Sequence, residues 1–291
     1  MSDRISYQGE PGANSQMACA AAYPDLEPVP CATFESALAA LQDGSARYAM
    51  IPIENSVAGR VADIHRLLPE SGLYIVAEHF QRVEHQLLGC PGSTLDQLKT
   101  VHSHTQALGQ CSHLIRELGL VACPQGDTAG AARLISEQGD LTQAAIASEL
   151  AADIYGLTVL RANIEDAVHN TTRFVVLARE PEDAQPEDAN VITTFLFHTR
   201  NVPASLYKAL GGFATNGVNM TKLESYQLEG SFSATMFYAD IEGHPAHANV
   251  QRALEELSFF SAQMRILGTY RAAPGRKKNH PATSLMPGYL P

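Results

Sequence analysis

One acidic segment, Arg179–Asn190 (REPEDAQPEDAN), constrains the fold of this 291-residue chain more than any other feature. It contains prolines and carboxylates and lacks large apolar residues, which is typical of a solvated linker. Because a hydrophobic core cannot run through such a segment, the chain is expected to form two parts with separate cores. We predict a linker at residues 181–190, a larger N-terminal part at 1–180 and a smaller part that begins at residue 191.

The C-terminal part has a legible order of elements. Its apolar patterns predict strand–helix–strand–strand–helix–strand, the order of a ferredoxin-like α+β domain, over residues 191–272. Residues 273–291 are rich in proline and glycine and carry the basic cluster Arg276–Lys278, so we expect them to be disordered. The six elements are expected at Val191–Thr199, Val202–Gly217, Asn219–Gln227, Ser231–Ile241, Ala246–Phe260 and Ala262–Tyr270.

The N-terminal part alternates strand-like and helix-like stretches, from RISYQG and NSQMACAAAY to a closing RFVVLA. Such alternation predicts an α/β fold in which helical crossovers connect parallel strands. The first strand, near residues 4–9, and the last strand, near 173–178, are expected in one sheet. The chain between them would form a second lobe. We therefore predict lobe 1 at about 1–80 and 161–180, lobe 2 at about 81–160, and a cleft between them.

The composition excludes several classes of protein. The net charge of −11 argues against nucleic-acid binding, which requires a basic surface. No apolar run approaches the roughly 20 residues that span a bilayer, and the N-terminus lacks a secretory pattern, so we expect a cytoplasmic protein. The five cysteines include no Cys-x-x-Cys pair, and His102 and His104 would point to opposite faces of a strand. We therefore expect reduced thiols and no metal site.

Five polar clusters stand at strand ends or helix starts, where α/β proteins place ligands. Each cluster also has a structural interpretation. Ser103 and Gln106 have the spacing of a capping box, and Asp127 or Thr128 suits a helix N-cap. Arg173 opens an apolar strand, where a charge needs a partner, either a ligand or a salt bridge. The clusters are GEPGANS (9–15), PIENSVAG (52–59), SHTQA (103–107), DTAG (127–130) and NTTRF (170–174).

Together, the order of these motifs resembles the prephenate dehydratase family, in its two-domain form with a C-terminal ACT domain. YQGEPGANSQMA is similar to the family's Y-x-G-x-x-G-x-x-S-x-x-A, and PIENSVAG matches P-x-E-N-S-x-x-G. SHTQALGQC, DTAGAA and NTTRFVVLA resemble S-H-x-Q-A-L-x-Q-C, S/D-T-A-x-A-A and N-x-T-R-F. The resemblance runs from about Arg4 to Tyr270, nearly the whole chain.

The resemblance implies decarboxylative dehydration of prephenate to phenylpyruvate, a step of phenylalanine biosynthesis, without a cofactor or a metal. It also implies a catalytic domain with two lobes, like a periplasmic binding protein. Thr172 would contact the leaving hydroxyl and supply or relay a proton, Arg173 would clamp a carboxylate, and Asn170 would orient the loop or the substrate. The substrate-binding residues that the resemblance implies are Asn55, Ser56, Ser103, Gln106, Thr128 and Phe174.

The C-terminal part resembles an ACT domain, a ferredoxin-like module that binds amino acids at subunit interfaces. This resemblance implies phenylalanine as an effector and a homodimer or homotetramer as the assembly. PASL (203–206) and ESYQ (224–227) stand where the family has G-A-L-V and E-S-R-P, so the strength and sign of the response stay open. The implied effector-binding residues are Ala204, Ser205, Leu206, Asn219, Glu224 and Ser225.

Two alternatives remain at this level. An arogenate dehydratase would perform the same chemistry on the corresponding amino acid, and the distinction rests on contacts to one small group. A non-catalytic sensor of amino acids or keto acids would share the two-lobed cleft and the ACT domain. The Thr172–Arg173 pair beside Asn170 argues against the sensor, because a protein that only binds its ligand has no need of an acid.

Overall fold

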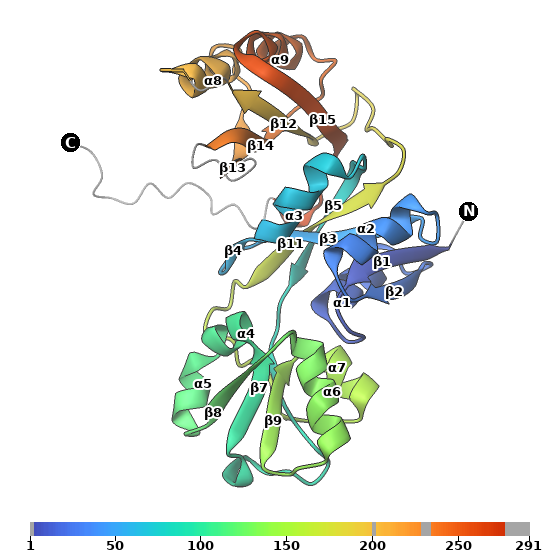
Figure 1. The fold of residues 1–291 in the computed structure, drawn as a ribbon, viewed down its shortest axis with the longest axis vertical. Helices are drawn as coiled ribbons and strands as arrows, with labels where there is room; N and C mark the ends of the chain where they lie inside the picture. The colour runs from blue at the N-terminus through green and yellow to red at the C-terminus, as the bar shows by residue number, and fades with distance from the viewer. Residues whose placement is uncertain (1–2, 200–201, 228–233, 277–291) are drawn as a thin grey trace, which may run out of the picture. The chain divides into compact units, whose positions relative to one another are not determined.

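The structure, a computed structural model, describes residues 3–199, 202–227 and 234–276 (Figure 1). The chain divides into two compact units. Unit 1 contains Met1–Val76 and Gln81–Pro181, and unit 2 contains Ala77–Phe80 and the chain from Glu182 onward. Within the described ranges, no helix is both long enough and apolar enough to cross a membrane.

Lobe 1 of unit 1 is built on a sheet with the strand order β2-β1-β3-β11-β5, in which the short β4 also pairs with β3 and the middle of β5, Ala77–Phe80, counts with unit 2. β1 runs parallel to β2 and β3, whereas β11 runs antiparallel to β3. The first and last strands of the N-terminal part therefore share one sheet, as predicted. The strands are β1 (Arg4–Gln8), β2 (Glu27–Cys31), β3 (Tyr48–Asn55), β4 (Gly59–Arg60), β5 (Tyr74–Arg82) and β11 (Thr171–Ala178), and the helices are α1 (Asn14–Ala22), α2 (Phe34–Gln42) and α3 (Ala62–Leu67), followed by a 3-10 turn at Leu68–Glu70.

Lobe 2 is built on a second sheet with the order β10-β6-β9-β7-β8. β7 is parallel to β8 and β9, but β6 is antiparallel to both β9 and β10. Both sheets are thus mixed rather than parallel, because β11 in one sheet and β6 in the other run antiparallel to a neighbour. The strands are β6 (Gln86–Gly89), β7 (Thr100–His104), β8 (Val121–Gln125), β9 (Gln143–Ala147) and β10 (Thr158–Arg161), and the helices are α4 (Thr105–Gln110), α5 (Ser112–Glu117), α6 (Thr128–Gln138) and α7 (Glu149–Tyr155), with a 3-10 turn at Leu95–Gln97.

Local sequence explains where the longer helices of unit 1 begin and end. Thr33 and Ser36 form a reciprocal capping box at the start of α2. Asp127 accepts a hydrogen bond from Gly130 N at 2.7 Å and caps α6. The same helix ends at Gly139, whose φ of 65° is the left-handed conformation that glycine adopts without strain.

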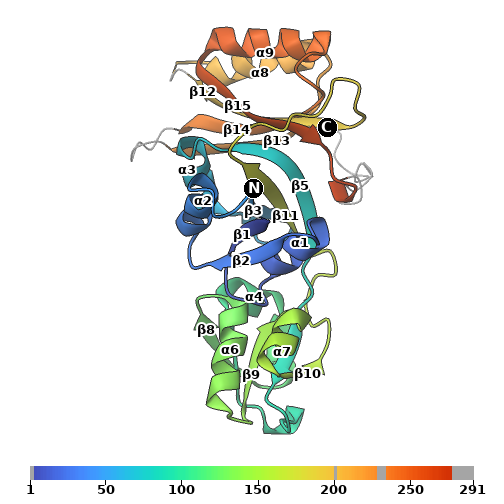
Figure 2. The ribbon, with the colours of Figure 1, turned by 90° about the vertical axis from the view of Figure 1, so that its right-hand side faces the viewer.

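Unit 2 has the predicted strand–helix order among its described residues, with the sheet order β13-β14-β12-β15 and antiparallel pairing throughout. α8 and α9 cover one face of this sheet (Figure 2). Their apolar sides pack on a core that includes Phe195, Phe197, Phe213 and Phe237. Residues 228–233, which include the expected hairpin, lie outside the described residues. The elements are β12 (Val191–Thr199), α8 (Ser205–Thr215), β13 (Met220–Gln227), β14 (Ala234–Glu242), α9 (Ala248–Phe260) and β15 (Ser261–Arg271).

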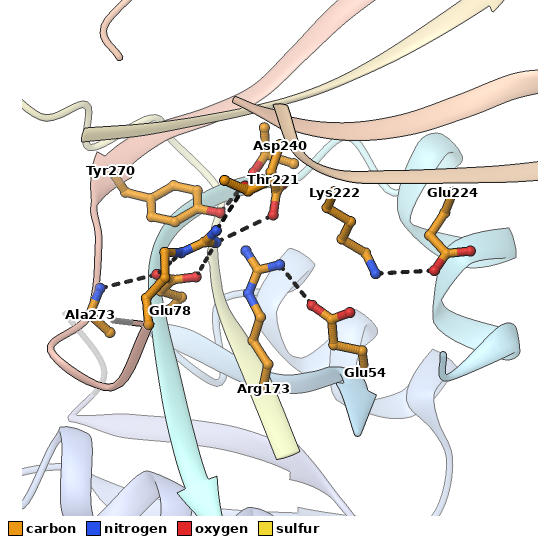
Figure 3. Close-up of polar contacts among 11 residues, drawn as sticks. Glu54, Glu78, Arg173, Thr221, Lys222, Glu224, Asp240, Tyr270 and Ala273 are labelled. Carbon is orange, nitrogen blue, oxygen red and sulfur yellow. Dashed lines mark hydrogen bonds and ion pairs between the residues drawn. The ribbon is translucent and has the colours of Figure 1, made fainter. Parts of the chain in front are cut away.

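The start of the expected disordered tail differs from the prediction. Arg276 is 7% exposed, and its guanidinium contacts the carboxylates of Glu78 and Asp240 within unit 2; Figure 3 labels these two acidic residues. Ala273 N also donates to Glu78 Oε1 at 3.1 Å. Residues 273–276 are therefore a packed part of unit 2, because a buried arginine there has buried acidic partners. The rest of the expected tail, 277–291, lies outside the described residues.

Candidate active site

A cleft of about 520 Å³ lies between the two lobes of unit 1. The lobes also meet directly beside it. Ser148 Oγ donates to Gly12 O at 2.5 Å, and Tyr155 Oη donates to Pro11 O at 2.8 Å. Gly12 has a φ of 92°, and a Cβ there would lie 2.8 Å from the Ala151 backbone. The loop GEPGANS is thus a close contact between the lobes, and glycine is required where the two backbones approach.

Thr172 and Asn55 form the centre of the lobe 1 wall of the cleft. They lie opposite each other where β11 pairs with β3, and both line the cleft. Asn55 Nδ2 donates to Thr172 Oγ1 at 3.0 Å, while Asn55 Oδ1 accepts the N–H groups of Val57 and Ala58 at 2.9 and 2.8 Å. These two backbone donors fix which end of the amide faces Thr172. The Thr172 oxygen is therefore an acceptor here, and its own proton is left to be donated elsewhere.

Arg173 lies on the other face of β11. Alternate strand residues point to opposite faces, so Thr172 and Phe174 line the cleft while Arg173 does not. The Arg173 side chain is 4% exposed, and its Nη1 donates to Glu54 Oε1 at 3.0 Å (Figure 3). The structure thus favours the salt-bridge interpretation over a carboxylate clamp, because sheet pairing turns this guanidinium away from the cleft.

Two further residues of the predicted site support the loop before β11. Ser56 Oγ donates to His169 O at 2.8 Å and accepts from Thr171 N at 3.0 Å, and Ser56 is not among the cleft-lining residues. Asn170 is 1% exposed, and its Oδ1 accepts a hydrogen bond from Asn55 Nδ2 at 2.8 Å. Both residues therefore hold the Asn55–Thr172 pair in place instead of facing the cleft.

Lobe 2 brings Gln106 and Thr128 to the opposite wall of the cleft. Ser103 is fully buried, however, and its hydroxyl donates to Ile146 O at 2.6 Å, which ties β7 to β9. The predicted capping box is wrong, since the N-cap of α4 is His104, whose Nδ1 accepts from Gln106 N at 3.3 Å. Ser103 belongs to β7 because the strand runs one residue further than the motif suggests.

Several cleft-lining residues were missed from sequence. His85, His104, Asn14, Ser15 and Arg60 all line the cleft. Asn14 and Ser15 lie within GEPGANS and could have been found there, but His85 and Arg60 carry no local signal. Among the described residues lining the cleft, Arg60 is the one arginine or lysine.

The electrostatics of the cleft are those of a mostly neutral polar site. Burial lowers the pKa of His85, against the opposing effects of the Gln110 hydrogen bond and the Glu165 charge. Asp127 directs one carboxylate oxygen to Gly130 N at the N-cap of α6. In the described part of the chain, no three His, Cys, Asp or Glu side chains converge as metal ligands do.

The predicted effector-binding residues all lie in unit 2. Ala204, Ser205 and Leu206 stand at the start of α8, where Ala204 has a left-handed φ of 62°. Glu224 and Ser225 lie on β13, an edge strand of the sheet. Glu224 Oε1 is 3.3 Å from Lys222 Nζ, and Asn219 Nδ2 donates to Glu242 Oε2 at 2.9 Å.

Comparisons with known proteins point in one direction. The prephenate dehydratase family model matches residues 5–182. A bifunctional N-acyl-homoserine lactone acylase/prephenate dehydratase from Komagataeibacter europaeus is 56% identical, over 94% of this chain and 98% of that protein. An arogenate dehydratase/prephenate dehydratase from Arabidopsis thaliana is 41% identical, over 92% of this chain and 71% of that protein. The structure of prephenate dehydratase from Arthrobacter aurescens in complex with L-Phe matches with a TM-score of 0.85 at 29% identity, over 96% of this chain and 92% of that one.

Proposed function

The chain belongs to the prephenate dehydratase family of phenylalanine biosynthesis, and from this premise we propose that unit 1 converts prephenate to phenylpyruvate, water and carbon dioxide. Membership makes the chain a dehydratase, that is, a lyase. The observation that carries the proposal is the Asn55–Thr172 hydrogen bond, which leaves the Thr172 proton available on the wall of a cleft.

The chemistry needs one proton at the leaving hydroxyl. Departure of carbon dioxide supplies the electron pair that completes the aromatic ring, and the carbon–oxygen bond breaks at the same time. Prephenate enters as a dianion, whereas the products are one monoanion, carbon dioxide and water, so each turnover takes up one proton from solution. Thr172 would donate its hydroxyl proton to the leaving oxygen and regain a proton from water.

The two substrate carboxylates would be held by different groups. Arg60 offers a guanidinium at the cleft and would take the role that the sequence suggested for Arg173. Ser15 and Gln106 provide neutral donors on the two lobes. Such a site can bind a dianion although the whole chain carries a net charge of −11, because interactions within a cleft are screened less than those with distant surface charges.

The test is phenylpyruvate formation from prephenate by the purified chain, followed by ultraviolet absorbance and by proton uptake. Thr172→Ser keeps a hydroxyl and should retain activity within about tenfold, whereas Thr172→Val should lose about 10²- to 10⁴-fold in kcat, the usual contribution of an acid, with little change in KM. Equal activity of Thr172→Val and the wild type would exclude Thr172 as the acid. A wild type without turnover on prephenate would overturn the proposed substrate.

Arogenate is the first alternative substrate, and it should be assayed in parallel. Several relatives at 38–41% identity are named as arogenate dehydratases. The amino group of arogenate would need a carboxylate nearby, and Asp63 lines the cleft. Turnover of arogenate at a higher kcat/KM than prephenate would reverse our assignment.

A second activity is favoured by one specific observation. The relative that shares 56% identity is named as a bifunctional N-acyl-homoserine lactone acylase, and it is matched over nearly its full length. We therefore propose acylase activity as a second candidate function, tested by homoserine lactone release from an N-acyl-homoserine lactone. Loss of both activities in Thr172→Val would assign them to one cleft, and absence of lactone release would reject this candidate.

For regulation, we propose that unit 2 is an ACT domain that binds phenylalanine. The support is its ferredoxin-like order and the similarity to a prephenate dehydratase solved in complex with L-Phe. Glu224→Gln should raise the phenylalanine concentration needed for half of the response, while Glu255→Gln, on the exposed side of α9, should not. A phenylalanine response curve for Glu224→Gln that is identical to that of the wild type would exclude Glu224 from the effector site.

For the assembly, we propose a homodimer or a homotetramer. Tyr207 on α8 and Phe259 on α9 are 81% and 77% exposed, and large aromatic side chains of this kind are enriched at interfaces between subunits. Light scattering on the purified protein measures the assembly directly, and a monomeric mass at micromolar concentration would reject the proposal.

A further inference from the structure

A chain of side-chain hydrogen bonds extends from Thr172 to Gln110 and His85, which also line the cleft. Asn55 Nδ2 contacts both Thr172 Oγ1, at 3.0 Å, and Asn170 Oδ1, at 2.8 Å. Asn170 Nδ2 then donates to Gln110 Oε1 at 3.0 Å, and the same oxygen lies 2.9 Å from His85 Nε2. His85, the far end of this chain, is 2% exposed.

The direction of each bond is set at the Asn55 end by the backbone. Because Asn55 Oδ1 accepts two backbone N–H groups, its Nδ2 must be the atom that faces Asn170. Asn170 therefore presents Oδ1 to Asn55 and keeps Nδ2 as the donor to Gln110. A flipped Asn170 amide would place two N–H groups against each other and would push the Asn55 amide away from Thr172.

The other end of the chain is set by His85. Gln110 Oε1 accepts from Asn170, so the His85 nitrogen that shares this oxygen must carry a proton. His85 Nδ1 is buried and, in the described part of the chain, has no hydrogen-bond partner. A proton on Nδ1 would be a buried donor without an acceptor, which is unfavourable. The geometry therefore requires the neutral imidazole with its proton on Nε2.

The surroundings of His85 agree with a neutral ring. In the part of the chain that the structure describes, the charge that acts on His85 is that of Glu165, whose Oε2 accepts the His85 backbone N–H at 3.1 Å. The Glu165 carboxylate is itself 3.6 Å from the Arg82 guanidinium, so part of its charge is offset. Gln110 on α4 contributes a neutral oxygen.

We propose that His85 is a positioning residue for the dehydration. It holds Gln110 with Oε1 toward Asn170, so that Asn170 and Asn55 keep their orientation and the Thr172 proton can only be donated into the cleft. The inference rests on the proposed function of Thr172. Without His85, Gln110 Oε1 loses the hydrogen bond from Nε2, so the Gln110 amide is held less firmly and the support that it gives to Asn170 and Asn55 is weakened.

The kinetic test compares two replacements of His85. His85→Leu removes the donor and should lower kcat about 10- to 100-fold while KM stays within about threefold. His85→Gln can place an N–H donor near the position of Nε2 and should recover activity to within about fivefold of the wild type. The control His102→Leu removes a half-buried histidine of lobe 2 that does not line the cleft, and it should stay within about twofold.

A second readout does not depend on turnover. In protein with ¹⁵N-labelled histidine, long-range ¹H–¹⁵N spectra should show His85 with a protonated Nε2 and an unprotonated Nδ1 from pH 6.5 to 8, assigned by comparison with His85→Gln. A proton on Nδ1, or an imidazolium, would overturn the inference even if His85→Leu did not fold.

The outcomes separate the two proposals. Wild-type turnover with an equally active His85→Leu would refute the role of His85 and leave the dehydratase assignment intact. A wild type inactive on prephenate and arogenate would refute the proposed function and, with it, the positioning role, whichever tautomer the spectra show. Both proposals would be supported by four results together: wild-type turnover of prephenate, a lowered kcat in His85→Leu, a recovered kcat in His85→Gln, and a proton on His85 Nε2.

Discussion

The Arg276 contact in unit 2 leads to the sharpest stability prediction. Arg276 Nε and Nη2 bind the two oxygens of Glu78 at 2.8 and 2.7 Å, and Nη2 also lies 3.3 Å from Asp240 Oδ2 (Figure 3). The Glu78 and Asp240 side chains are 0% exposed. Arg276→Met keeps most of the side-chain volume but removes the charge, so two buried carboxylates lose a cationic partner.

The expected cost is about 3–5 kcal/mol in the free energy of unfolding of unit 2, which is typical when one partner of a buried ion pair is removed. Thr194 also donates to Asp240 Oδ1 at 2.6 Å, a neutral contact that Arg276→Met leaves in place. Adding Glu78→Gln and Asp240→Asn to Arg276→Met removes the two buried negative charges as well. This triple variant should therefore be more stable than Arg276→Met alone.

The assay is urea unfolding followed by circular dichroism, with hydrogen exchange of peptides from β12 and β15 to report unit 2 separately. A loss of 3–5 kcal/mol corresponds to about a 10²- to 5 × 10³-fold fall in protection where exchange requires unfolding of the unit. Chains that end at Arg276 and at Ala272 form a matched pair, since they differ only in residues 273–276. A loss below about 1 kcal/mol in Arg276→Met, or no difference within the matched pair, would refute the reasoning.

Three further predictions follow from burial and charge. Arg173→Met should lower the free energy of unfolding by about 1–3 kcal/mol but change KM for prephenate less than twofold. A large rise in KM would instead support Arg173 as the residue that clamps a substrate carboxylate. Burial raises the pKa of Cys19 to about 12 and also raises the pKa of Cys111, so iodoacetamide at pH 8 should modify neither thiol until urea unfolds the chain. Rapid modification of either thiol in the folded protein would contradict this prediction. Burial lowers the pKa of His85, so the folded state binds fewer protons than the unfolded state, and stability that is present above about pH 6.5 is lost as the pH falls. The loss between pH 7.5 and 5.5 should be smaller in His85→Gln, and equal losses would reject this contribution.

Much of the fold was predictable from sequence because it depends on local patterns. The acidic segment 179–190 separates two patterns of elements, and the order of unit 2 followed from the alternation of apolar residues. The pairing of the first and last strands of unit 1 was also predicted. The antiparallel direction of β11 and β6 was not, because strand pairing joins segments far apart in sequence and the pattern within one strand does not give the direction of its neighbour.

The residues of the site were predictable where they follow one another in a motif. They were less predictable where the direction of the side chain decides whether it reaches the cleft. Thr172, Asn55, Gln106, Thr128 and Phe174 all line the cleft. Four other predicted residues do not line it. Ser56 and Asn170 support the loop before β11, and the side chains of two more serve the interior of the lobes. They are Arg173, which pairs with Glu54, and Ser103, which binds Ile146 O.

The sequence by itself determined the order of the elements, the family and the identity of the polar residues at the strand ends. The tertiary structure alone decided which of these residues face the cleft, because register and pairing set the face of each strand residue. It also decided the burial of Arg276 and the hydrogen-bond chain from His85 to Thr172, since each joins residues distant in sequence. A charge or an amide becomes functional or structural through the partner that folding brings to it, and that partner cannot be read from its neighbours in the chain.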